Sequence, residues 1–196
     1  MLISMPAAPV AANIAWDIDQ PGQANRGEFT GRRRATLLAQ APRWYAEVTL
    51  PPIIGEARVL DWRAFVVDCD GIANSFRVIA CERPQITGVT VTVKGAGQFA
   101  HQLVTQGWGA AGLKLRRGQF FTVNDQLLML QADVVADASG TAVLKFKPYL
   151  RFSPANAAAV EVTRPYAVMV MSDPRSGWKV GIGQNYAVTF KCEEAF

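Results

Sequence analysis

The sequence predicts a mainly β protein, built as an antiparallel sandwich or barrel with one helix. Many short stretches alternate apolar and polar residues with a period of two, and glycine, proline, aspartate or asparagine separates them. About ten such strands are expected beside one segment of helical period, a ratio that favours a sandwich or barrel over an alternating α/β fold.

Two strands are expected in the first 50 residues. Residues 14–19 alternate apolar and polar, so their apolar side chains share one face of a strand. Residues 43–50 combine aromatic and β-branched side chains and end before two prolines, which cannot donate ladder hydrogen bonds. The intervening residues 20–34 are polar and contain glycine, and we interpret them as a loop.

One helix is expected at residues 56–67. Leu60, Ala64 and Val67 recur at i, i+4 and i+7, with Phe65 alongside, and this spacing predicts an amphipathic helix. Gly71 lies just beyond the periodic segment and indicates that the helix stops before it.

The rest of the chain continues the β pattern. Residues 116–119 contain Gly118 and indicate a turn that joins two strands in a hairpin. Residues 137–140 indicate a second hairpin, which joins strands at 127–135 and 141–146, and residues 173–177 have a turn composition as well. The expected strands are residues 74–80, 89–93, 113–115, 120–123, 127–135, 141–146, 160–162, 166–171 and 186–191.

Composition predicts a soluble, folded chain. Half of the 196 residues are hydrophobic and 18% are charged, which excludes the composition of a disordered protein. No apolar run reaches the ~18 residues that a membrane span needs. The first ten residues lack a basic stretch and contain prolines, so we expect no secretion signal and a protein that stays in the cytoplasm where it is made.

Charge and cysteine content suggest no special chemistry. The net charge of +4 would permit contact with nucleic acid, but the basic clusters are short, at Arg32–Arg34 and Arg116–Arg117. We interpret them as solvated loop charges and do not expect direct nucleic-acid binding. Three separated cysteines, Cys69, Cys81 and Cys192, form no C-x-x-C pair, so buried free thiols are expected.

The candidate catalytic and cofactor motifs all lack their context. His101 is the single histidine and has no acidic neighbour in sequence to orient it. Residues 95–100 match G-x-G-x-x-A, but later glycines interrupt the helix that a dinucleotide site requires, so a glycine-rich loop is expected. Asp68–Gly71 matches only a fragment of a calcium loop and indicates a helix end followed by a turn. We therefore expect no catalytic residue, cofactor or metal.

Two groups of segments resemble structural proteins of phage tails. An aromatic strand, a proline stop, a helix with a late phenylalanine and a Gly-x-x-Asn-x-Phe strand resemble the amino-terminal belt region of distal tail proteins of long-tailed, siphovirus-like bacteriophages. The later segments resemble phage structural proteins that carry a small β-barrel. The segments are Trp16, Arg43–Tyr45, Leu50–Pro52, Trp62, Phe65 and Asp70–Phe76, then 115–123, 132–144 and 148–151.

The resemblance implies a fold and a role. It implies an antiparallel β-sandwich belt domain with one helix at residues 1–87 and 164–196, and a smaller inserted β-barrel, OB-like or galectin-like, at residues 88–163. The belt would form a homo-hexameric ring between the tail tube and the baseplate hub of a virion whose tail serves host attachment. Expected partners are further copies of the chain, the tail tube protein, and baseplate hub or tail fibre proteins, with no membrane and no enzymatic activity.

Four aromatic residues are candidates for the interfaces of such a ring: Trp44, Tyr45, Trp62 and Trp108. Aromatic side chains are enriched in interface cores, although each of these four could equally fill the core of the monomer. Two other functions stay open. The first is a carbohydrate-binding or host-surface-binding β module, and the second is a tail-associated hydrolase that uses His101 or an acidic residue.

Overall fold

The structure, a computed structural model, describes residues 1–37 and 42–195 and divides into two compact units. The first unit comprises residues 1–19, 43–78 and the segment from Val168 onward. The second comprises the described residues of 20–42 together with 79–167. The protein is mainly β, with one α-helix among the described residues and a closed barrel inserted in the chain, as the sequence predicts.

The unit boundaries differ from the expected domain boundaries. The chain enters the second unit after Val78 and leaves it after Ala167, whereas the sequence placed these changes at residues 87/88 and 163/164. Residues 20–42, expected in the belt domain, also group with the second unit. The strands Ser75–Ile79 and Tyr166–Met171 run through these two unit boundaries without a break, so no proline or glycine marks either boundary.

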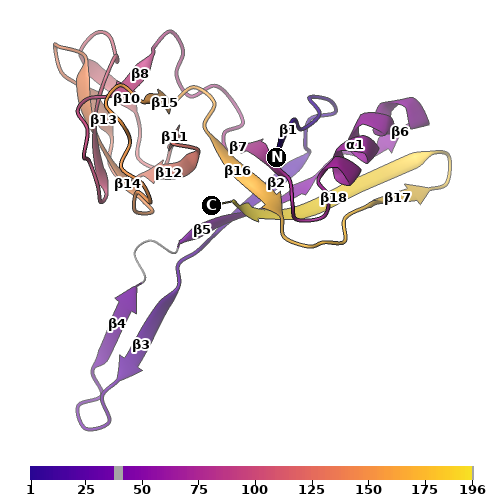
Figure 1. Cartoon of the computed structure of the whole chain (residues 1–196), viewed down its shortest axis with the longest axis horizontal. Helices are drawn as coiled ribbons and strands as arrows, with labels where there is room; N and C mark the ends of the chain where they lie inside the picture. The colour runs from indigo at the N-terminus through magenta and orange to yellow at the C-terminus, as the bar shows by residue number, and fades with distance from the viewer. Residues whose placement is uncertain (38–41, 196) are drawn as a thin grey trace. The chain divides into compact units, whose positions relative to one another are not determined.

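An eight-stranded sheet forms most of the first unit (Figure 1). The long strand β18 unites it: Asn185–Val188 pairs with β17, whereas Thr189–Glu193 pairs with β5. The main path is β1 (Leu2–Ile3), β7 (Ser75–Ile79), β16 (Tyr166–Met171), β18 (Asn185–Glu194), β5 (Arg43–Thr49) and β2 (Asn13–Asp19), and β6 (Ile53–Ile54) and β17 (Trp178–Gly181) both pair with β18.

Helix α1 (Glu56–Asp68) packs its aromatic side on this sheet. Trp62 and Phe65 meet at 5.7 Å between ring centroids, and Phe190 of β18 lies 5.9 Å from Phe65. The helix was predicted, but its buried face was not. Leu60 and Val67 are 50% and 64% exposed, because the bulkier aromatic stripe beside them buries more apolar area and so takes the core position.

The end of α1 follows the interpretation of residues 68–71 as a helix end and turn. Cys69 closes the last turn by donating its backbone N–H to Phe65 O at 3.1 Å. Asp70 and Gly71 then take positive φ angles of 46° and 65°. The side-chain amide of Asn74 fixes this turn by donating to Asp68 O at 2.7 Å and to Asp70 Oδ2 at 2.9 Å.

A closed antiparallel barrel forms the core of the second unit. Because every strand pairs on both sides, the ring leaves no free edge. Trp108, Phe121 and Phe146 fill its interior with 1% or less of each residue exposed. The strands, in order around the ring, are β11 (Phe120–Val123), β12 (Gln126–Leu130), β14 (Thr141–Lys147), β9 (Gln102–Gln106), β8 (Val91–Val93) and β15 (Ala159–Glu161), with β10 (Gly112–Leu115) and β13 (Val134–Ala136) as a separate pair.

One of the two expected barrel turns connects different strands from those predicted. Residues 116–119 do form a tight turn, but β10 pairs with β13 and β11 pairs with β12, so the predicted hairpin is wrong. The hairpin is instead β11–β12, whose turn residues Asn124 and Asp125 have φ angles of 49° and 58°. The predicted turn at 137–140 is confirmed by a hydrogen bond from Gly140 N to Asp137 O. The single strand predicted at 127–135 is two strands, β12 and β13, and β14 pairs with β12.

Residues 20–34, predicted as a loop, contain most of a β-ribbon. Strands β3 (Gly22–Arg26) and β4 (Arg33–Leu37) pair in register and lie side by side in Figure 1. We call residues 22–37 the arm. The glycine-rich segment 95–100 is a loop, as predicted.

Candidate assembly surfaces

The arm is a folded element without a core of its own. Every residue of β3 and β4 is exposed. An isolated two-stranded hairpin is marginally stable at best in water, because it buries too little apolar surface to offset the entropy of ordering its chain. The arm therefore has the properties of an element that gains its order from a partner.

The pairing register gives the arm two chemically different faces. Residues that pair directly in an antiparallel ribbon share a face, and the face alternates along each strand. One face, which we call the apolar–basic face, has apolar pairs followed by a pair of arginines, and the other is polar. The first consists of Gly22 with Leu37, Ala24 with Ala35 and Arg26 with Arg33; the second consists of Gln23 with Thr36 and Asn25 with Arg34.

The apolar–basic face carries an uncompensated charge and an uncovered apolar group. Arg26 and Arg33 stand directly opposite each other, an arrangement in which like charges destabilise a ribbon. The arm contains four arginines and one glutamate, a net charge of +3 within a chain of net charge +4. Leu37 lies across Gly22, where an added Cβ would be 2.8 Å from Leu37 Cδ2, yet Leu37 stays 64% exposed.

Helix α1 offers a second exposed surface in the first unit. Ala57, Leu60, Ala64 and Val67 lie on one face of the helix at i, i+3, i+7 and i+10 and are all exposed, and we call these four residues the helix stripe. An apolar stripe of this kind normally faces a core. Here the core is on the opposite side of the helix, so the stripe faces away from it.

The C-terminal end of α1 is locally negative. Its last turn contains Asp68 and no basic residue, and Asp70 follows directly, although the helix dipole at this end favours cations. The same two carboxylates add to the effect of burial, which raises the pKa of the Cys69 thiol to about 11. The N-terminal ammonium of Met1 donates to Asn74 Oδ1 at 2.9 Å, and Asn74 Nδ2 donates to Asp70 Oδ2, so one cation already lies near Asp70. Asp68 is the carboxylate that a further cation would meet at this end of the helix.

A groove of about 370 Å³ runs beside the N-terminal half of α1. Trp62 Nε1 donates to Ala8 O at 3.1 Å and so holds the N-terminal segment along the helix. The lining is mainly apolar: Ala8, Pro9, Pro52, Ile53, Ile54, Ala57, Arg58 and Asp61.

Three of the four aromatic residues expected at interfaces are core residues. Trp44 is 4% exposed, Trp62 is 1% exposed and Trp108 is fully buried. Trp108 Nε1 donates to Thr105 Oγ1 at 2.8 Å, and Thr105 Oγ1 donates to Ala142 O, so the indole N–H is satisfied inside the barrel. Residue type alone does not separate core aromatics from interface aromatics, and here the core prevails.

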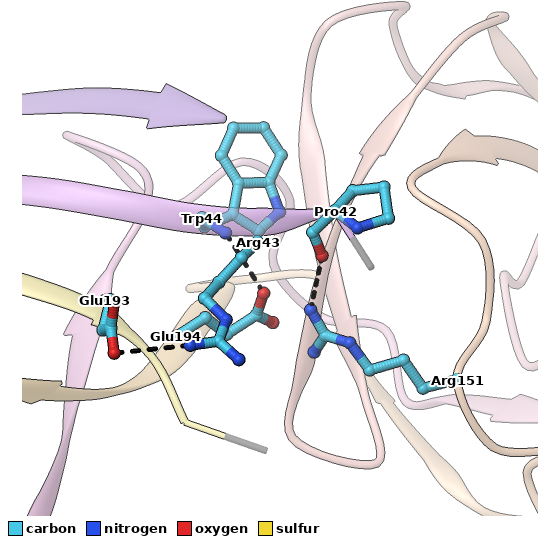
Figure 2. A network of polar contacts seen from close by, with 6 residues as sticks. All are labelled: Pro42, Arg43, Trp44, Arg151, Glu193 and Glu194. Atoms are coloured by element: carbon cyan, nitrogen blue, oxygen red, sulfur yellow. Dashed lines mark hydrogen bonds and ion pairs between the residues drawn. The ribbon is translucent and has the colours of Figure 1, made fainter. Parts of the chain in front are cut away.

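Tyr45, the fourth candidate, lies half-buried on the outer face of the sheet. Glu193 stands opposite it on β18 and forms an ion pair with Arg43 at 3.3 Å. Burial first, and then the Glu193 carboxylate, raise the pKa of Tyr45. Figure 2 shows Arg43 reaching Glu193, and the buried Glu194 accepting a hydrogen bond from the backbone N–H of Trp44 at 3.3 Å.

Arg151 links two segments of the second unit. Its guanidinium Nη2 donates to Pro42 O at 2.9 Å (Figure 2). Gln126 holds the same loop, because its Oε1 accepts from Arg151 N at 3.0 Å and its Nε2 donates to Tyr149 O at 2.8 Å. Residues 149–151 are thus fixed from two sides.

An aromatic group lies on the barrel beside this loop. The backbone N–H of Leu150 donates to Ala100 O at 3.1 Å, which places the loop next to the segment before β9. His101 is exposed, and its ring meets Tyr149 edge-on at 5.2 Å between centroids. Phe99 and Phe152, on the same two segments, are 55% and 70% exposed.

The remaining candidates for chemistry are structural in their placement. Cys69 and Cys192 are buried and Cys81 is half-buried, and all three are free thiols. Burial raises the pKa of Cys192 to about 12, which keeps its thiol protonated. Within residues 1–37 and 42–195, no three His, Cys, Asp or Glu side chains are grouped so as to hold a metal ion.

Comparison of the chain with protein-family models and with curated proteins finds no match. Among the described residues, no helix has both the length and the apolar character needed to cross a membrane.

Proposed function

We propose that this chain is a structural subunit of a bacteriophage tail, of the distal tail class, which associates with copies of itself into a ring between tail tube and baseplate hub. The arm is the observation that carries this proposal. Its ten strand residues are all exposed, so it is organised for a contact outside the chain.

Further surfaces support an assembly role. The helix stripe exposes apolar side chains in a regular row, and apolar groups arranged in a patch mark interaction sites more often than scattered ones do. Strand β17 adds Val180, 59% exposed, and the hairpin tip adds Ile182, which is fully exposed. The resemblance to tail-tip proteins gives these surfaces their proposed partners: identical copies, the tail tube protein, and hub or fibre proteins.

The test is the solution mass of the purified protein by light scattering, followed by negative-stain images of the same fraction. A closed ring near six times the 21.3 kDa chain, about 130 kDa, is expected, since closed symmetry is what a ring adaptor needs. A monomer that stays monomeric at high concentration and in the presence of tail tube protein would contradict the proposal.

A second candidate function, binding of carbohydrate on the host surface, is favoured by the aromatic group on the barrel. Exposed rings offer apolar faces on which other flat groups stack. His101 meets Tyr149 edge-on, and Phe99 and Phe152 are exposed on the same two adjacent segments. Titration calorimetry with host cell-wall polysaccharide tests it. Saturable binding that Phe152→Ala weakens at least tenfold would support this function, and equal heats for both proteins would exclude the aromatic group as the binding site.

A further inference from the structure

The apolar–basic face of the arm requires a partner with two properties. It must cover the apolar pairs that end at Leu37, and it must bring negative charge to Arg26 and Arg33, which repel each other across the ribbon. Leu37 and Arg33 are four residues apart on one strand, so the face extends over about 13 Å.

The helix stripe and the end of α1 provide this combination. Leu60, Ala64 and Val67 form the apolar part, and Asp68 and Asp70 form the negative part at one end. From Leu60 to Asp68 the helix rises about 12 Å, which matches the length of the arm face. Beyond the acidic end lies Ile72, 57% exposed, where the fully exposed Phe29 at the arm tip would arrive.

We propose that the apolar–basic face of the arm docks on the helix stripe of a second copy of this chain, with Arg26 and Arg33 next to Asp68 and Asp70. The inference rests on the proposed function, because it names the contact through which copies associate. The charges favour this orientation, since cations are stabilised at the C-terminal end of a helix. The contact is head-to-tail, so each copy uses its arm once and its helix once, as a ring requires.

Nucleic acid is the other occupant that an arginine-rich arm would suit, and the arm fits it less well. Arg33 and Arg34 are consecutive in a strand and point to opposite faces, so Arg34 cannot join Arg26 and Arg33 on one face to follow a phosphate backbone. Leu37, Ala24 and Ala35 would also stay uncovered on a nucleic acid. A protein surface with an apolar part and an acidic end accounts for both features.

The test uses reversed charges in the full chain, with association measured by light scattering and sedimentation over a concentration series. Arg33→Glu is expected to weaken association at least tenfold. Arg34→Glu is the matched control, because it makes the same charge change on the polar face and should leave association unchanged. On the partner surface, Asp68→Arg should weaken association as Arg33→Glu does, and Asp61→Arg, seven residues earlier, should have the smaller effect.

The decisive part of the experiment is the restoration of association by a second substitution. An equimolar mixture of Arg33→Glu and Asp68→Arg chains should associate like the wild type, since every arm then meets a helix end of opposite charge. The double variant Arg33→Glu/Asp68→Arg should associate with itself in the same way. A variant that merely failed to fold would be rescued by neither, so restoration separates a contact from a folding defect.

The outcomes separate this inference from the proposed function. Open-ended filaments of protomers that the substitutions at residues 33 and 68 abolish would support the contact and contradict the ring. A ring that forms equally with all variants would support the ring and overturn the contact. A monomer at every concentration would overturn the contact, and so would a DNA duplex that binds through both Arg33 and Arg34 while the mass stays unchanged.

Discussion

Two antiparallel hairpins of the second unit share a pairing pattern and differ in everything that stabilises it. Hairpin β11–β12 and the arm β3–β4 both run in register with four or five residue pairs. In β11 three of four residues are buried, and both strands pair again with further strands of the barrel. In the arm every strand residue is exposed.

The difference shows that backbone pairing and stability are separate properties. A backbone hydrogen bond contributes little net free energy, because it replaces bonds to water, so the burial of side chains decides whether a hairpin is stable by itself. Hairpin β11–β12 belongs to the barrel core, and the barrel has no free edge. The arm has two free edges and two open faces, so its stability must depend on what it contacts.

The largest expected effect comes from the same substitution made in both regions. Phe121 is fully buried on β11 and packs edge-on against Phe146 at 5.3 Å, so Phe121→Ala should lower the free energy of unfolding by about 3–5 kcal/mol. Phe29 at the arm tip is fully exposed, so Phe29→Ala should change it by less than about 0.5 kcal/mol. Urea denaturation of the two variants measures both values. Equal losses would show that the arm is packed in the isolated chain.

A smaller effect is expected at the β11–β12 turn. Asn124 and Asp125 both have positive φ, the geometry of the turn that suits the twist of a two-residue hairpin. Asparagine tolerates this conformation and a β-branched residue does not, so Asn124→Val should lower the free energy of unfolding by about 1–2 kcal/mol. Asn124→Gly, which relieves the backbone, is the control and should not destabilise. Thermal unfolding of both variants checks this, and equal melting temperatures would contradict the turn assignment.

The periodicity of apolar residues predicted the strands and the helix that have one buried face. Strands β2, β5 and β16 and helix α1 lie where the sequence placed them, since in each the apolar residues recur at the period of the element. The spacing of Leu60, Ala64 and Val67 did not identify the buried face of α1, because the aromatic stripe beside them recurs as regularly. Only the size of the buried side chains distinguishes the two.

The arm could not be predicted in this way, because a strand exposed on both faces leaves no hydrophobic period. Residues Arg32–Arg34 form a basic cluster, but this cluster does not distinguish a strand from a loop, because a loop and a polar strand can have the same composition. The β11–β12 hairpin does have a signal in the sequence, which is the Asn124–Asp125 pair between two apolar runs. The enrichment of aromatic residues at interfaces indicated Trp44, Tyr45, Trp62 and Trp108, whereas the exposed surfaces contain arginine, alanine and leucine.

The smallest expected effect is a local gain in the arm. Arg33→Glu replaces a like-charge pair with an opposite-charge pair across the ribbon, facing Arg26, and such cross-strand pairs contribute roughly 0.2–1 kcal/mol. Compared with wild-type protein that is also monomeric, amide hydrogen exchange of the monomeric variant should therefore slow in β3 and β4 and stay unchanged in β11 and β12. Arg34→Glu, opposite Asn25, should slow it less.

The result bears directly on why the arm has this sequence. If Arg33→Glu makes the isolated arm more stable and at the same time weakens association, then the Arg26–Arg33 pair lowers the stability of the free arm in favour of an acidic partner. With both proteins kept monomeric by dilution, faster exchange in Arg33→Glu than in the wild type would show that the two arginines do not repel across the ribbon. In that case the Arg26–Arg33 pair would not lower the stability of the free arm, and the pair alone would give no reason to expect an acidic partner.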